Sequence, residues 1–185
     1  RRSVLQAASS GQLVEQDSTD EPASKTIRRT WDDRRQSQPK LPFQTDDLPQ
    51  LSDGWCWASL EQLTDGSRYA MKAGPFGSAL KKEFYVPTGF KIYGQEQVIR
   101  GDPYYGDYYI SRDLFEKLQS CEVKPGDVLV SLVGTIGKVL ILPINIEPGI
   151  INPRLVKFSF DYRIVDSRYF KYYLESQSAR DYFSI

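Results

Sequence analysis

Histidine is absent from this sequence, and cysteine occurs at only two positions, Cys56 and Cys121. Without histidine, the chain has no Ser–His or Cys–His pair for nucleophilic catalysis. The two cysteines are far apart and lack the spacing of metal ligands, so a zinc site would need at least two carboxylates, which is unusual for structural zinc. The sequence therefore excludes these two kinds of nucleophilic catalysis, and we expect no metal site. Two distant cysteines are also typical of a protein in a reducing cytoplasm.

Long apolar runs and an excess of one charge are missing as well. No stretch approaches the ~20 apolar residues of a membrane span, so we expect no membrane partner. The 24 Lys and Arg residues are balanced by 24 Asp and Glu residues. This balance excludes a strongly basic, non-specific DNA coat but not a reader with a few cations on one face. The 185 residues, 40% of them hydrophobic, suffice for one compact domain with additional segments.

Composition divides the chain into three regions. Residues 1–14 place apolar side chains on one helical face and then reach Gly11, which predicts the end of a helix. Residues 15–50 are rich in Gln, Ser, Thr, Asp and Pro, which predicts an extended, poorly packed linker with Trp31 as its one anchoring side chain. Residues 51–185 have the hydrophobic pattern of a folded domain.

Short apolar segments within residues 51–185 predict an α+β fold. We expect a mixed, mostly antiparallel sheet with short flanking helices, and a helical tail at the N-terminus of the chain. The expected strands are residues 90–93, 128–133, 138–142 and 155–160. The expected helices follow the capping residues Ser111 and Asp166.

One stretch partly resembles a phosphate-binding loop. Residues 134–139 read Gly-Thr-Ile-Gly-Lys-Val. The phosphate-binding loop needs four residues between its glycines and a Ser or Thr after the lysine. Here two residues intervene and Val139 follows, so the pattern favours a hairpin loop between two strands.

Two further stretches partly resemble enzyme motifs. Residues 102–105 resemble the D-P-P-Y loop of amino-methyltransferases, but the second proline is missing and no glycine-rich cofactor loop precedes them. Residues 122–124 resemble the E-x-K of nucleases, with Asp107 or Asp113 as a partner carboxylate, but a Pro-Gly turn follows at once. A stand-alone nuclease or methyltransferase stays an alternative to a binding protein.

Tyrosine is abundant, and several tyrosines alternate with cations. Twelve tyrosines occur in 185 residues, among them Tyr93, two positions after Lys91. Tyrosine with Arg or Lys suits a hydrated surface that binds phosphates and base edges. Half or more of these tyrosines are equally compatible with ordinary packing, and together they would also suit an oligomer interface. Composition therefore leaves a DNA-binding protein and a protein-interaction module both open.

Five segments, in this order, resemble the target-recognition domain of type I restriction–modification specificity subunits: residues 54–60, 74–81, 124–138, 149–155 and 169–176. Residues 3–13 resemble the end of the long helix that separates the two recognition domains of such a subunit. The resemblance implies a prokaryotic, cytoplasmic and non-catalytic subunit that recognises one half of a split target in double-stranded DNA. It also implies that the sequence is part of a longer polypeptide.

The resemblance further implies which partners and side chains take part. Methyltransferase and restriction subunits would be the protein partners, and S-adenosylmethionine, ATP and Mg would belong to them, so that this chain binds no cofactor. Amides suit adenine, arginine suits guanine, and lysines and hydroxyls suit phosphates. The residues that we expect to contact DNA are Ser78, Lys81, Lys82, Tyr93, Gln95, Thr135, Lys138, Asn152 and Arg154.

Overall fold

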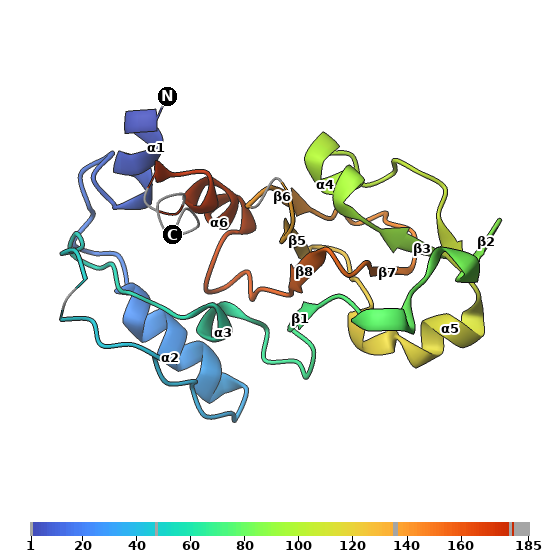
Figure 1. Cartoon of the computed structure of the whole chain (residues 1–185). Coiled ribbons are helices and arrows are strands. Elements are labelled where there is room, and N and C mark those ends of the chain that lie inside the picture. Colours follow the sequence, from blue (N-terminus) through green and yellow to red (C-terminus); the bar gives the residue numbers. More distant parts are fainter. Residues whose placement is uncertain (1, 47, 135–136, 178, 180–185) are drawn as a thin grey trace. The chain divides into compact units, whose positions relative to one another are not determined.

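The computed structural model describes residues 2–46, 48–134, 137–177 and 179 and confirms the expected α+β fold (Figure 1). The chain divides into two compact units. One unit is formed by Arg1–Gly66 together with Phe160–Ile185, and the other is formed by Ser67–Ser159. In the described part of the chain, no helix combines the length and the apolar composition that a membrane span requires.

The strands of Ser67–Ser159 form two four-stranded sheets, where the sequence analysis expected one. The first sheet is antiparallel throughout and has the order β1 (Met71–Ala73), β8 (Leu155–Phe158), β5 (Val128–Ser131) and β6 (Val139–Ile141). The second sheet has the order β2 (Tyr85–Val86), β4 (Tyr109–Ile110), β3 (Phe90–Tyr93) and β7 (Gly149–Ile151). Its β3–β7 pair is parallel and its other pairs are antiparallel.

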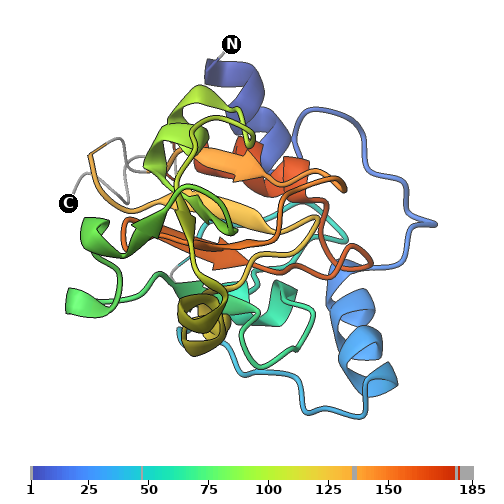
Figure 2. The same cartoon turned by 90° about the vertical axis from the view of Figure 1, so that its right-hand side faces the viewer.

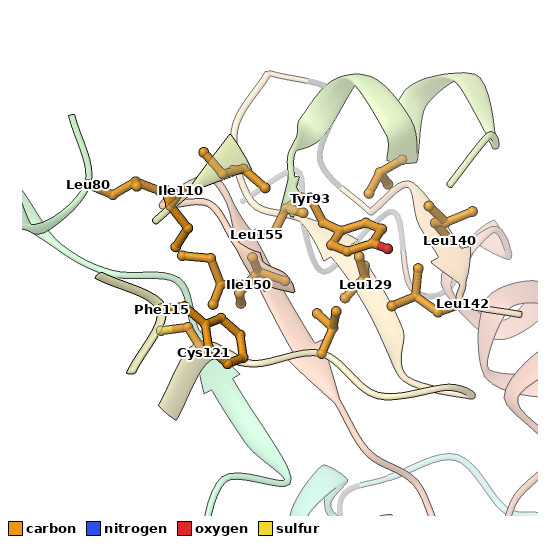
Figure 3. Packing of buried hydrophobic residues seen from close by; sticks show 14 residues of the cluster. Leu80, Tyr93, Ile110, Phe115, Cys121, Leu129, Leu140, Leu142, Ile150 and Leu155 are labelled. Carbon is orange, nitrogen blue, oxygen red and sulfur yellow. The ribbon is translucent and has the colours of Figure 1, made fainter. Parts of the chain in front are cut away.

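The core of this unit is built from strands of both sheets. All four residues of β5 are buried, as expected for a strand without polar alternation that is covered on both faces. Figure 3 shows the ring of Tyr93 among Leu129, Leu140 and Leu142. Ile150 of β7 is 0% exposed, and complete burial of such an aliphatic side chain contributes about 1.5–3 kcal/mol.

Short helices complete Ser67–Ser159. Helix α4 (Gln95–Arg100), which the sequence analysis did not predict, packs against β5 and β6 (Figure 2). Helix α5 (Arg112–Lys117) begins where expected, because the hydroxyl of Ser111 accepts a hydrogen bond from Leu114 N. The 3₁₀ turns are η1 (Gly77–Ala79), η2 (Lys82–Phe84) and η3 (Gln119–Cys121).

Ion pairs of two buried lysines link the strands of this unit to its turns. Lys157 Nζ lies 3.4 Å from Asp127 Oδ2, and Ser159 Oγ donates to Asp127 Oδ1 at 2.6 Å. In the second sheet, Lys91 Nζ donates to Glu147 Oε1 at 2.7 Å. Both lysines are at most 3% exposed, so neither contributes to a charged outer face.

The labelled helices of the other unit lie in both of its chain segments. They are α1 (Arg2–Ser9), α2 (Ala23–Asp33), α3 (Leu60–Leu63) and α6 (Ser167–Leu174). Helix α1 ends just before Gly11, which has a φ of 72°, as the sequence predicts. Helix α6 packs against α1, and Tyr169 OH donates to Ser9 O at 3.1 Å.

Helix α2 lies within residues 15–50, where an extended linker was expected. That expectation is wrong for residues 23–33, because Ile27 and Trp31 are four residues apart and bury one helical face. Trp31 is an anchor, as expected, since its Nε1 donates to Gln62 O at 3.0 Å. The domain boundaries expected at residues 15 and 51 stay predictions.

Candidate nucleic-acid interface

Parallel pairing of β3 and β7 brings two predicted DNA-contacting amides to one edge of the second sheet. Tyr93 pairs with Ile151 at the end of both strands. Asn152 follows at once, and its backbone N donates to Tyr93 O at 2.8 Å. Gln95 begins α4 directly after β3. Because parallel strands end at the same edge, the residues after both strands lie together.

The β5–β6 loop meets the same edge. Leu132 N donates to Arg154 O at 2.9 Å, and Gln95 Nε2 donates to Val133 O. The side chain of Arg154 is exposed, as is that of Lys138 on the returning arm of the loop. Thus Gln95, Asn152, Arg154 and the hairpin form one group, which we call the amide–arginine edge. Thr135, also predicted to contact DNA, lies outside the described residues.

The segment after β1 is in contact with this edge. Gly74 N donates to Leu155 O at 3.0 Å. A side chain at Gly74 would overlap the backbone carbonyl of Asn152, so only glycine permits this close approach. The predicted phosphate contacts follow along the same segment and are all exposed: Ser78 in η1, Lys81, whose Nζ lies 3.5 Å from Glu83 Oε1, and Lys82 in η2.

Tyr93 does not belong to this surface, and its prediction as a DNA contact is corrected. Its side chain is 1% exposed and lies in the core. Its hydroxyl donates to Glu147 O at 2.7 Å. Burial of the phenol, with Glu147 nearby, raises the pKa of Tyr93 well above its usual value. The sequence pattern of Lys91 followed by Tyr93 suggested a charged surface, but Lys91 is buried as well, so the pattern did not reveal that Tyr93 belongs to the core.

The amide–arginine edge is partly satisfied by its own backbone. Asn152 Oδ1 accepts a hydrogen bond from Arg154 N at 2.9 Å and so shapes the turn that presents Arg154. Gln95 Nε2 donates a hydrogen bond to Val133 O. A bidentate contact of either amide with adenine would therefore require one of these hydrogen bonds to break. A single contact from Gln95 Oε1 or Asn152 Nδ2 leaves the turn intact.

Charge is distributed unevenly between the two units, although the whole chain is neutral. Ser67–Ser159 holds 12 Lys and Arg residues against 9 Asp and Glu residues, a formal charge of +3. The remaining residues hold 12 against 15, a formal charge of −3. Because the buried Lys91 and Lys157 are each paired with an acid, the positive excess of Ser67–Ser159 lies among its other charged residues. An anionic partner is attracted to this unit in preference to the other.

Comparison with known proteins supports the resemblance seen in the sequence. The sequence matches no protein-family model. It is 25% identical over 191 residues to the specificity subunit of the type I restriction enzyme EcoAI from Escherichia coli. The chain is therefore similar to a part of a type I specificity subunit. The alignment covers 95% of the chain but 31% of that relative, so the chain spans about a third of its length.

Two solved structures also resemble the chain. One is the HsdS subunit of Thermoanaerobacter tengcongensis, with 18% identity, a TM-score of 0.45, and coverage of 83% of this chain and 32% of that one. The other comes from a study of complex assembly and conformational transition in a type I restriction–modification system. It has 16% identity, a TM-score of 0.48, and coverage of 83% and 34%.

The enzyme-like stretches of the sequence have local structural roles. Strands β5 and β6, which flank the stretch that resembles a phosphate-binding loop, pair antiparallel, as expected for a hairpin. Lys124 N donates to Asp127 Oδ2 at 2.9 Å, which closes the turn after the E-x-K stretch. Asp102 Oδ1 accepts from Tyr104 N at 2.9 Å in a similar local turn. Among the described residues, no cluster of three or more acids or cysteines is suited to a metal ion.

Sequence reasoning missed the apolar part of this surface. Leu132 and Val133 were assigned to a buried strand, but β5 ends at Ser131 and they are 44% and 50% exposed. Phe76, in the segment after Gly74, is 77% exposed. Its position between two glycines was the available signal, because such a loop holds no regular strand or helix that would bury an aromatic ring.

Proposed function

We propose that this chain reads a DNA sequence as the target-recognition part of a type I restriction–modification specificity subunit. The observation that carries the proposal is the amide–arginine edge, where Gln95, Asn152 and Arg154 meet on the rigid ends of a parallel strand pair. Sequence reading needs donors and acceptors fixed at base edges, together with cations that set the register on phosphates.

The charge of Ser67–Ser159 supports this proposal. Lys81, Lys82, Lys138 and Arg154 are exposed on the segments that meet or continue from the amide–arginine edge. Arg154 is placed to donate to the acceptors of guanine or to a phosphate, because a guanidinium offers two parallel N–H donors. The amides would add contacts to adenine, and the lysines would bind the backbone.

The partners follow from the same proposal. The chain would bind one half-site of double-stranded DNA, while methyltransferase and restriction subunits would carry out the chemistry. S-adenosylmethionine, ATP and Mg would then be cofactors of those subunits, and this chain would be non-catalytic. The related EcoAI protein is a specificity subunit of a restriction enzyme, which is the context in which these partners occur.

Salt-dependent binding tests the electrostatic part of the proposal. Binding of fluorescent duplexes is measured by anisotropy between about 50 and 200 mM salt for the chain and for Lys138→Gln and Arg154→Gln. Removal of one phosphate-binding cation lowers the slope of log affinity against log salt by about one. Lys117→Gln, which removes the same charge from an exposed site on α5, is the matched control and keeps the slope of the unmodified chain.

A protein-interaction module is the competing function, because Leu132 and Val133 expose apolar surface beside Arg154. This alternative predicts self-association, or capture of a partner, without salt-dependent DNA binding. Sedimentation of the same samples separates the two functions. Concentration-dependent association together with no DNA binding at about 50 mM salt would contradict the proposed function.

A further inference from the structure

Phe76 exposes an aromatic ring on the loop that meets the amide–arginine edge at Gly74. Its side chain is 77% exposed, whereas Phe115 and Phe158 of the same unit are at most 8% exposed. An exposed ring of this size gains little stability from folding, because most of its surface stays in water. The ring is therefore free to contact a partner, and its place on the loop that meets the amide–arginine edge, which Ile144 does not share, is what singles it out.

The backbone on both sides of Phe76 is fixed. On one side, Gly74 is hydrogen-bonded to Leu155 and fits against the Asn152 carbonyl with no room for a side chain. Pro75 is buried and has a restricted φ. On the other side, Ala79 N donates to Phe76 O at 3.4 Å, and Leu80 is 8% exposed in the core. The ring is thus presented from an anchored turn two residues from the contact with Asn152.

The residues that meet the Phe76 loop at Gly74, two positions before the ring, indicate which part of DNA the ring would meet. Asn152 and Arg154 carry the donors that read base edges in the major groove, where each base pair has a distinct pattern. Phenylalanine has no hydrogen-bonding group. The apolar feature of the major-groove edges is the C5-methyl group of thymine. A ring presented two residues from the backbone contact with Asn152 can therefore contact the thymine of a base pair whose adenine meets the amide.

We propose that Phe76 is a sequence-reading residue that contacts a thymine methyl group in the major groove of the half-site. This inference rests on the proposed function, because it needs the amide–arginine edge to face base edges. It adds a residue that the sequence analysis did not predict, and it assigns the chemical group that this residue recognises.

Replacement of thymine by uracil, which lacks only the methyl group, tests the contact. The half-site is first defined by selection of bound duplexes, and each of its thymines is then replaced in turn. For the unmodified chain, removal of the contacted methyl group weakens binding about fourfold, the value expected for one buried methyl. Phe76→Ala weakens binding of the unmodified half-site by a similar or larger factor and no longer responds to uracil at that position.

Ile144→Ala is the matched control. Ile144 is 90% exposed and precedes β7, whereas Asn152 follows the end of β7. Its replacement leaves affinity and the response to uracil unchanged. Thermal unfolding of both variants verifies folding, which truncation of exposed side chains does not perturb.

Three outcomes would overturn the inference. In the first, Phe76→Ala binds as tightly as the unmodified chain, and in the second it keeps the full response to uracil at every position. In the third, a fluorescent base analogue placed in the half-site brightens on unstacking only when Phe76 is present, and no thymine position responds to uracil. That result would indicate that Phe76 is a wedge between bases and does not contact a methyl group. If the unmodified chain selects no half-site, the proposed function itself fails, whereas a half-site read equally well by Phe76→Ala overturns only the role of Phe76.

Discussion

Replacement of Gly74 by alanine probes the contact that holds the Phe76 turn against the amide–arginine edge. The new Cβ would lie 2.5 Å from the carbonyl carbon of Asn152 and 3.0 Å from Pro153 Cα. Carbon atoms pack best at about 3.5–4.0 Å, so the two backbones must separate by about 1 Å. Both neighbours are backbone atoms, which cannot rotate away. We expect a cost of about 3 kcal/mol, at the upper end of overpacking substitutions.

Gly77→Ala is the matched control for this prediction. Gly77 has open space around it but a φ of 62°, so alanine there costs about 1–2 kcal/mol for its left-handed conformation alone. Urea unfolding of both variants gives the two free energies of unfolding. Binding of the selected half-site, measured where both variants are folded, should fall more for Gly74→Ala. Equal stability losses, or an unchanged affinity for Gly74→Ala, would refute the close approach that we describe.

Two further predictions concern buried charges. Lys157→Met leaves Asp127 buried without its cation and should lower the free energy of unfolding by about 3–5 kcal/mol. The double variant Lys157→Met, Asp127→Leu should recover much of this loss, because no unpaired charge is then buried. Denaturant unfolding of the single and double variants measures both effects. Burial alone raises the pKa of Asp161, but hydrogen bonds from Arg163 and Arg34 outweigh it and hold the pKa well below its usual value. Because the folded-state pKa is depressed, this stabilisation is complete above the unfolded value of ~3.9 and is lost as the pH falls below about 4. Unfolding of the unmodified chain and of Asp161→Asn between pH 2 and 7 tests this, and curves that stay parallel below pH 4 would contradict it.

Local signals in the sequence located several elements correctly. Strand β3 has the predicted bounds, residues 90–93. Helix α5 begins after Ser111 because the capping hydroxyl satisfies a free backbone N–H. The hairpin between β5 and β6 follows from two β-branched segments joined by a glycine-rich loop. These features depend on residues close together in the chain, which a single sequence can reveal.

Features that depend on distant pairing were missed. The strands β2 and β4 have only two residues each and exist because they pair with one another and because β4 pairs with β3. Helix α4 has six residues, too few for a clear periodicity. Lys91 looked like a surface cation, since its partner Glu147 is far away in the sequence. A second sheet could therefore not be inferred from local pattern.

The candidate site was predicted residue by residue but not as an arrangement. Gln95, Asn152 and Arg154 were chosen for their chemistry, whereas their proximity depends on the parallel β3–β7 pair. The hydrogen bond from Gln95 Nε2 to Val133 O likewise joins residues that are distant in the sequence. Phe76 was overlooked because exposure of an aromatic side chain is a property of the folded chain.

Selection of bound duplexes from a random DNA library, at low and at raised salt, tests the central claim most directly. The chain is compared with Arg154→Gln and with the control Lys117→Gln. We predict that the unmodified chain and the control enrich the same short motif, and that Arg154→Gln relaxes one position of it at a cost of about 1–3 kcal/mol. Binding without enrichment of any motif, from folded protein, would contradict sequence reading by this chain.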